Sequence, residues 1–407
     1  HRLLARLYIF QKEWRDAMEN AQLAFDLLEN NKDTFNEPDH PLMQAESLFL
    51  LGTIYFKQNN FSSANFYYKL GLDKVSFSQN PALYLNLKEN LAYVYYKTGN
   101  YNKSINIFYE LLDIENQNKN APVVISALHA LAMNFYQVNN LKKMRNYMMD
   151  AKDLYQSIES QIEDRKKYQF KYFYRSAKLY KKIKNYSRAE KNCEKAIEVA
   201  DATEDQELLY EALMQMSDIL ILRFTGEDEE KELIENYISE SIDIANQLED
   251  KSKYVSCLLK RAQLLKDTSE GYKIKDILNE SEEIAQNIDN EYLLGKIYKR
   301  FGLYYYYMKE YKKAREYFLK SEKIFKRIGH LKYLGEIYYN LGCISVARGE
   351  LYQAPEYFEA SLRDIQNFFS GEINLALSLL AVGRESDAIL ILQNLNQNYP
   401  ENPLVLN

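Results

Sequence analysis

Glycine and proline are scarce in this sequence, which has 13 Gly and 7 Pro in 407 residues. An all-β protein needs frequent turns, and these two residues supply many of them, so this class is excluded. Long stretches rich in Leu, Ala, Lys, Glu, Tyr and Ile instead favour helices. We therefore expect an all-α protein, built either as roughly two or three compact domains or as one long solenoid.

Cysteine and histidine are also rare. The sequence contains three cysteines: Cys193, Cys257 and Cys343. Its four histidines are His1, His40, His129 and His330. The cysteines are too far apart for a disulfide framework or a zinc cluster, which suits a reducing compartment, and we predict a cytoplasmic protein. The histidines lack the spacing of a metal site, so we expect no metal and no cofactor.

Other signals of function are missing as well. No apolar run approaches the roughly 18 residues of a membrane helix, and no signal peptide opens the chain. The formal net charge of −6 argues against a nucleic-acid-binding surface over the whole body. No glycine-rich phosphate loop, G-x-S-x-G or H-E-x-x-H motif occurs. We predict that the chain is not an enzyme and that it binds neither a membrane nor nucleic acid directly.

What the sequence does contain is a repeat, seen most clearly in residues 295–329 (GKIYKRFGLYYYYMKEYKKAREYFLKSEKIFKRIG). It predicts two helices joined by a tight turn. Small residues stand at positions 8, 20 and 27 of this copy: Gly302, Ala314 and Ser321. Large residues stand at positions 7, 11 and 24: Phe301, Tyr305 and Phe318. The small residues let the two helices approach closely, and the large ones fill the space between them.

Further copies recur along the chain, most of them about 40 residues apart. They begin at Ala45, Leu85, Ile125, Phe170, Tyr210, Val255, Gly335 and Phe369. Position 15 is Asn or Gly in five copies: Asn59, Gly99, Asn139, Gly349 and Gly383. Helices commonly end with such a residue in the left-handed conformation, so we predict a break there. We expect Pro355 within the first turn of its helix, and residues 225–232 to lengthen the turn of their copy.

This pattern resembles the tetratricopeptide repeat, whose small residues at positions 8, 20 and 27 and aromatic residues at 11 and 24 match here. The usual unit has about 34 residues, so the longer spacing predicts helices with close to one extra turn each. The tryptophan expected at position 4 is absent, since the only one is Trp14. HEAT repeats share the longer period but lack this pattern of small residues.

The resemblance implies an all-α, right-handed superhelix (an α-solenoid) of about nine to ten helical hairpins. We expect residues 1–44 to form an N-terminal cap or partial repeat, with a loop. Residues 45–407 are expected to form one continuous repeat domain.

In a tetratricopeptide superhelix, the first helix of each repeat lines a concave groove. Asn and Gln side chains there can match an extended peptide backbone, and Arg can bind a carboxylate through two bonds. The candidate groove residues are Asn86, Asn90, Tyr93, His129, Met133, Lys171, Tyr174, Arg175, Lys178, Gln215, Lys260, Gln263, Arg300, Tyr306 and Asn340.

One helix of the repeat at Phe170 is strongly basic, because Lys171, Arg175, Lys178 and Lys182 share one face. Two interpretations are open. The stripe is either solvated and partly neutralised by Asp218 and Asp267, or it binds an anionic group of a ligand.

Two functions remain open. In the first, the chain senses a short signalling peptide. It resembles the cytoplasmic peptide-pheromone receptors of Gram-positive bacteria (the RRNPP type), which implies quorum sensing. It would be a transcriptional regulator only if a helix-turn-helix precedes His1, and none is visible in residues 1–44. In the second, it is a non-catalytic scaffold or adaptor that binds a partner protein's tail. An upstream DNA-binding domain would separate the two, and a homodimer is compatible with both.

Overall fold

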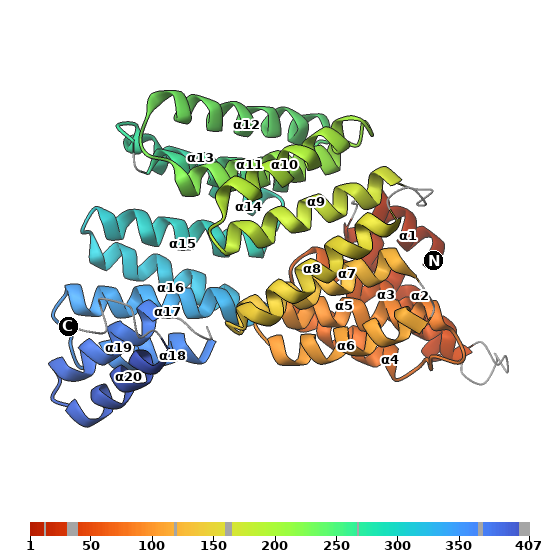
Figure 1. The fold of residues 1–407 in the computed structure, drawn as a ribbon, viewed down its shortest axis with the longest axis horizontal. Coiled ribbons are helices and arrows are strands. Elements are labelled where there is room, and N and C mark those ends of the chain that lie inside the picture. Colours follow the sequence, from red (N-terminus) through yellow and green to blue (C-terminus); the bar gives the residue numbers. More distant parts are fainter. Residues whose placement is uncertain are drawn as a thin grey trace. The chain divides into compact units, whose positions relative to one another are not determined.

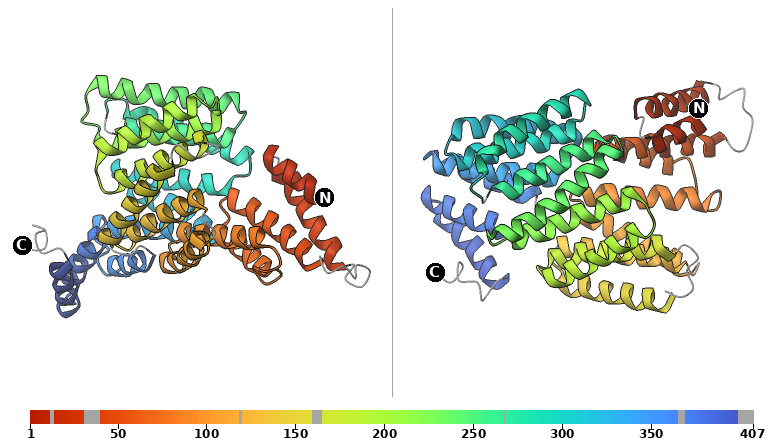
Figure 2. Two further views of the ribbon diagram at one scale, coloured as in Figure 1. Left: turned by 45° about the vertical axis from the view of Figure 1, so that its right-hand side comes forward. Right: turned by 90° about the horizontal axis from the view of Figure 1, so that it is seen from above.

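The computed structural model describes residues 1–11, 14–30, 40–117, 120–158, 165–266, 268–364 and 369–398. Over these residues the chain forms twenty α-helices and one short 3-10 helix, with no strand (Figure 1). Consecutive helices run side by side as hairpins in all views (Figures 1 and 2). The predicted fold class, an all-α solenoid of helical hairpins, is therefore confirmed.

The chain divides into two compact units, which we describe separately. Unit 1 comprises residues 1–119 together with Phe325–Tyr333, and unit 2 comprises the rest. The helices of residues 1–119 are α1 (Arg2–Gln11), α2 (Trp14–Asn30), α3 (His40–Lys57), α4 (Phe61–Leu72), α5 (Pro81–Lys97) and α6 (Tyr101–Gln117). The predicted division into residues 1–44 and 45–407 stays a prediction.

From residue 120 onward the chain continues with seven hairpins in the described residues. Their helices are α7 (Ala121–Gln137), α8 (Leu141–Ile158), α9 (Arg165–Lys182), α10 (Tyr186–Asp201), α11 (Gln206–Arg223), α12 (Asp228–Gln247), α13 (Lys251–Leu265), α14 (Ile274–Asn287), α15 (Glu291–Tyr307), α16 (Tyr311–Ile328), α17 (Leu331–Ala347), α18 (Ala354–Asp364), α19 (Phe369–Ala381) and α20 (Glu385–Asn398). The 3-10 helix η1 (Gly271–Lys273) precedes α14.

Within a hairpin, position 8 of the first helix lies against the aromatic ring at position 24 of the second. A Cβ atom placed on Gly302 would lie 2.9 Å from the ring of Phe318. On Gly52 it would lie 2.6 Å from the ring of Tyr68. Any side chain at these glycines would displace a buried ring, so the predicted close approach of the two helices is confirmed.

The turns inside the hairpins also agree with the repeat. All five predicted turn residues have a positive φ: Asn59 (59°), Gly99 (86°), Asn139 (57°), Gly349 (75°) and Gly383 (81°). The same position is occupied by Lys184 and Lys309 in two other hairpins, both with φ 59°. The sequence pattern does not single out these lysines, because lysine has no preference for the left-handed region.

The prediction that residues 225–232 lengthen a turn is confirmed only in small part, because four residues (224–227) separate α11 from α12, against three (58–60) between α3 and α4. Helix α12 already begins at Asp228, and its first turn contains three carboxylates: Asp228, Glu229 and Glu230. Negative charge there is favourable, because the helix dipole is positive at its N-terminus. The extra acidic residues therefore lengthen α12 to 20 residues. Pro355 is the second residue of α18, so its predicted place in the first turn is confirmed.

The segment Phe325–Tyr333 packs on α4 within unit 1. The ring centroid of His330 lies 5.4 Å from that of Phe61 and 4.3 Å from that of Tyr333. The backbone at Gly329 adopts φ 73°, and an atom in place of its hydrogen would lie 3.5 Å from the Ser62 Cβ. Aromatic contacts and one tight backbone turn thus join residues that are far apart in the sequence.

Candidate ligand-binding site

Polar side chains connect the first helices of successive hairpins in unit 2. Each contact joins residues on two neighbouring helices of the series α7, α9, α11, α13, α15, α17 and α19. We call this set of contacts between first helices the polar ladder. Its contacts are Arg175 with Ser126, Gln215 with Tyr174, Lys181 with Asp218, Lys260 with Asp218, Arg300 with Gln263, Lys299 with Glu336, and Asn374 with Tyr339.

The ladder begins with a histidine packed between α7 and α9. His129 is 2% exposed; its Nδ1 lies 3.1 Å from the Ile125 backbone oxygen and its Nε2 3.3 Å from the Ser176 Oγ. Arg175 donates from Nη1 to the Oγ of Ser126 and, over 3.3 Å, to its backbone oxygen. Burial, and then the charge of Arg175, lower the pKa of His129 to about 3. The ring is therefore neutral near pH 7 and fixes the two helices together.

Gln215 occupies the next position along the ladder. It is 3% exposed, and its Nε2 donates to the backbone oxygen of Tyr174 over 3.0 Å. Among the described residues, its Oε1 has no hydrogen-bond donor. A buried acceptor left unsatisfied destabilises a fold by about 1–3 kcal/mol. Burial, followed by the charge of Glu211, raises the pKa of Tyr174 well above its ordinary value.

The middle of the ladder is a group of cations around one carboxylate. Lys181 Nζ lies 3.0 Å from Asp218 Oδ2, and Lys260 pairs with Asp218 Oδ1. Burial and the positive charges of Lys181, Lys296 and Arg300 lower the pKa of Lys260 well below its ordinary value. We call these five residues the Lys260 cluster. Three cations and one carboxylate therefore lie close enough to Lys260 to act on its charge.

The basic stripe predicted on α9 does not converge on one partner. Its three lysines each lie over a tyrosine ring: Lys171 over Tyr168 at 5.8 Å, Lys178 over Tyr174 at 4.1 Å and Lys182 over Tyr136 at 5.1 Å. Such cation–π contacts stabilise an ammonium group. Asp218 contacts Lys181, which is not part of the predicted stripe, and Asp267 lies outside the described residues.

The predicted asparagines form hydrogen bonds within their own helices. Asn90 Nδ2 donates to the Asn86 backbone oxygen over 2.8 Å, and Asn340 Nδ2 donates to that of Glu336 over 2.6 Å. In each case one N–H of the amide is used, so a ligand would contact the second N–H or the carbonyl oxygen. Asn86 itself is exposed.

The other candidates lie near aromatic residues or on the helix surface. The ring of Tyr93 packs edge-on against Phe108 at 5.3 Å, and that of Tyr306 lies 5.7 Å from Tyr311. Met133 is half-buried on α7. Asn86, Asn90 and Tyr93 belong to unit 1 and all other candidates to unit 2. A binding role for the candidate residues stays a prediction.

Comparison with known families agrees with this geometry. Residues 85–118 and 170–203, which include most of α5–α6 and α9–α10, match the model of the tetratricopeptide repeat. The chain contains tetratricopeptide repeats. No curated protein matches the sequence significantly.

Solved structures with the same repeat architecture cover most of the chain. A Rap protein complexed with Competence and Sporulation Factor is 17% identical, with a TM-score of 0.53, over 79% of this chain and 86% of that one. The apo quorum sensor NprR from B. thuringiensis is 16% identical, with a TM-score of 0.53, over 79% and 86%. The Rap conjugation gene regulator of plasmid pLS20, complexed with the Phr* peptide, is 14% identical, with a TM-score of 0.51, over 80% and 93%. Such low identities establish a shared fold only.

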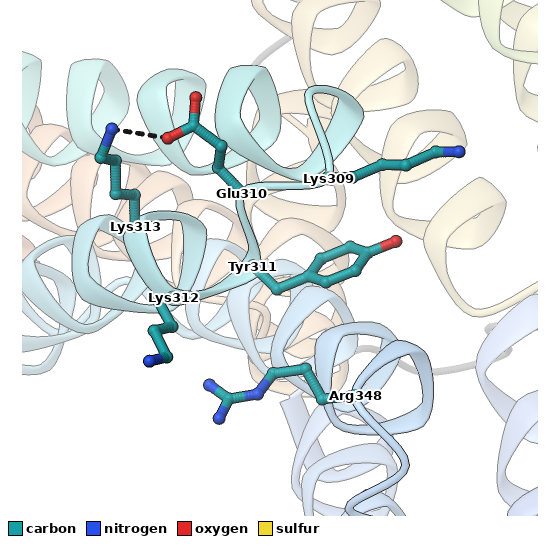
Figure 3. A pocket seen from close by; sticks show the side chains of 6 residues that line it. All are labelled: Lys309, Glu310, Tyr311, Lys312, Lys313 and Arg348. Carbon is teal, nitrogen blue, oxygen red and sulfur yellow. Dashed lines mark ion pairs between the residues drawn. The ribbon is translucent and has the colours of Figure 1, made fainter.

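A surface depression lies apart from the polar ladder, at the turn of the tetratricopeptide hairpin α15–α16 (Figure 3). It is lined by Lys309, Glu310, Tyr311, Lys312, Lys313 and Arg348. Figure 3 shows Glu310 turned toward Lys313, with which it pairs at 2.5 Å. Arg348 pairs with Glu350 at 3.0 Å. Two of the basic side chains that line the depression, Lys313 and Arg348, thus have a carboxylate partner nearby.

Among the described residues, no group of three or more His, Cys, Asp or Glu side chains could hold a metal ion. None of the described tetratricopeptide helices is long and apolar enough to cross a membrane.

Proposed function

We propose that the chain is a non-catalytic, cytoplasmic regulator that senses a short peptide bound along the first helices of its tetratricopeptide repeats. The observation that carries this proposal is the polar ladder, which presents amide and basic side chains on successive first helices. An extended peptide offers alternating N–H and C=O groups, and amide side chains can bond both kinds.

The fold likeness supports a peptide as the ligand. Two of the three similar structures are described as complexes, one with Competence and Sporulation Factor and the other with the Phr* peptide.

The alternative is a scaffold that binds the tail of a partner protein. The two functions differ in what is bound, since a sensor binds a free short peptide and a scaffold needs the whole partner. A role in transcription requires a helix-turn-helix upstream of His1. We propose no reaction, because the contacts of the polar ladder present no nucleophile beside a base.

The test is peptide binding by the 407-residue chain. It is immobilised and exposed to a mixture of short peptides, and retained peptides are identified by mass spectrometry and titrated by calorimetry. The variant Arg175→Ala is expected to weaken binding at least about thirtyfold, because the charge-assisted hydrogen bond from its guanidinium to a peptide carbonyl oxygen is lost. The matched control is Lys191→Ala, an exposed lysine on the second helix α10, which is expected to bind like the unsubstituted chain. Equal affinity of both variants would place the site away from α9, and no retained peptide would favour the scaffold.

A further inference from the structure

The Lys260 cluster holds more positive than negative charge on four neighbouring first helices. Lys181 lies on α9, Asp218 on α11, Lys260 on α13, and Lys296 and Arg300 on α15. The side chains of Lys260 and Lys181 are only 13% and 18% exposed. Two largely buried ammonium groups therefore share one aspartate. Bringing charged groups out of water is unfavourable unless opposite charge compensates for it.

We infer that the Lys260 cluster is the anion subsite of the peptide site and that the ligand is an acidic peptide, which places a carboxylate there. This inference rests on the proposed function. It names the class of ligand and moves the anion subsite from the basic stripe of α9 to α13 and α15.

The stripe and the cluster differ in what compensates the charge of their lysines. On α9, Lys178 lies over the ring of Tyr174, whereas Lys181 and Lys260 share Asp218. On α15, Arg300 Nη2 donates to the neutral Oε1 of Gln263 over 2.9 Å. An incoming carboxylate can replace that amide oxygen, and charge-assisted bonds are roughly twice as strong as neutral ones. Asp218 would keep its contact with Lys181 while the ligand pairs with Lys260 and Arg300.

The low pKa of Lys260 is consistent with such a site, because neighbouring cations disfavour its protonated form. A ligand carboxylate would reverse this effect and favour the ammonium form. Binding is therefore accompanied by proton uptake at pH values between the pKa of Lys260 in the free chain and its higher pKa in the complex.

The experiment uses three pools of hexapeptides whose random positions contain neither Asp nor Glu. One pool has a free C-terminus and a fixed Gln, one has an amidated C-terminus and a fixed Glu, and one has an amidated C-terminus and a fixed Gln. The unsubstituted chain is expected to retain one or both of the first two pools at least about tenfold better than the third. The pool that is retained identifies the carboxylate as terminal or side-chain.

Equal retention of all three pools would overturn the carboxylate subsite and leave the proposed peptide binding intact. Retention of none would overturn both.

Variants test where the carboxylate binds. Lys260→Met is expected to reduce peptide retention at least about tenfold, whereas Lys191→Met is expected to leave it unchanged. Asp218→Asn is expected to increase retention severalfold, because the resident carboxylate no longer competes. A thermal melt checks the fold of each variant. If Lys260→Met does not fold, Arg300→Gln replaces it with the same expected loss. Unchanged retention in a folded Lys260→Met or Arg300→Gln variant would place the anion elsewhere.

Discussion

The inside of each hairpin and the polar ladder between hairpins are stabilised by different forces. Inside, glycine meets an aromatic ring, as Gly302 meets Phe318, and the contact is one of shape. Across the ladder, the contacts are hydrogen bonds and ion pairs, such as those of Asp218 with its two lysines. Packing tolerates little change of volume, whereas polar contacts can exchange partners. The hairpins are therefore suited to hold a rigid frame and the ladder to accept a ligand.

The largest expected effect at neutral pH is a change of volume inside a hairpin. Gly302→Leu places a branched side chain where even a Cβ atom would lie 2.9 Å from the ring of Phe318. Overpacking of a buried position commonly destabilises by about 1–3 kcal/mol, and we expect the upper end here. Chemical denaturation measures this loss. As a comparison, Gly349→Leu has open space around its Cβ position and is expected to lose only about 0.5–1 kcal/mol, through its positive φ. An equal loss in both variants would mean that the contact with Phe318 does not matter.

An effect that is smaller at pH 7 and grows on acidification is expected where the ladder meets α7. The pKa of His129 is lowered from 6.5 to about 3 in the folded chain. As the pH falls, the unfolded chain therefore binds a proton at His129 at a higher pH than the folded chain does. Stability from the neutral ring is complete above pH 6.5 and falls as the pH drops toward 3. The expected slope is about 1.4 kcal/mol per pH unit within this window.

Urea denaturation of the unsubstituted chain and of His129→Gln at a series of pH values isolates the histidine. The variant is expected to be less stable at pH 7 but to lose less stability on acidification. Parallel pH profiles for the two proteins would show that His129 is accessible to protons in the folded state, against the burial found between α7 and α9.

The hairpins could be predicted from the sequence because each copy repeats the same local requirement. A small residue at position 8 needs a large one at position 24 of the same hairpin, and Gly or Asn marks the turn between them. The turns at Lys184 and Lys309 carry no such mark, although their backbone is the same. The residue pairing and the turn both lie within two helices and their connection, so predicting a hairpin needs no distant part of the chain.

The partners within the ladder could not be predicted in the same way. The positions of Lys260, Gln263 and Arg300 in the repeat predict only that they lie on first helices. That Asp218 contacts both Lys181 and Lys260 depends on how three helices are rotated relative to one another. His129 illustrates the same limit, because its position suggests a groove wall and its 2% exposure follows from the neighbouring α9. Which side chains meet across two helices depends on how the helices pack. The spacing of residues along one helix does not reveal it.

The smallest expected effect concerns the turn, where neither packing nor charge is at stake. Lys309 has φ 59° between α15 and α16, a conformation that is unfavourable for a residue with a Cβ. Lys309→Gly removes this strain but adds freedom to the unfolded chain, so we expect the free energy of unfolding to rise by about 0.5–1 kcal/mol.

The reverse change is available in the next hairpin, where Gly349 has φ 75° and no atom within 4 Å of its Cβ position. Gly349→Lys should lose a similar amount, since only the backbone conformation is changed. Denaturation curves of both variants decide the point: shifts of the same sign would show that the left-handed turn does not control the stability of these hairpins.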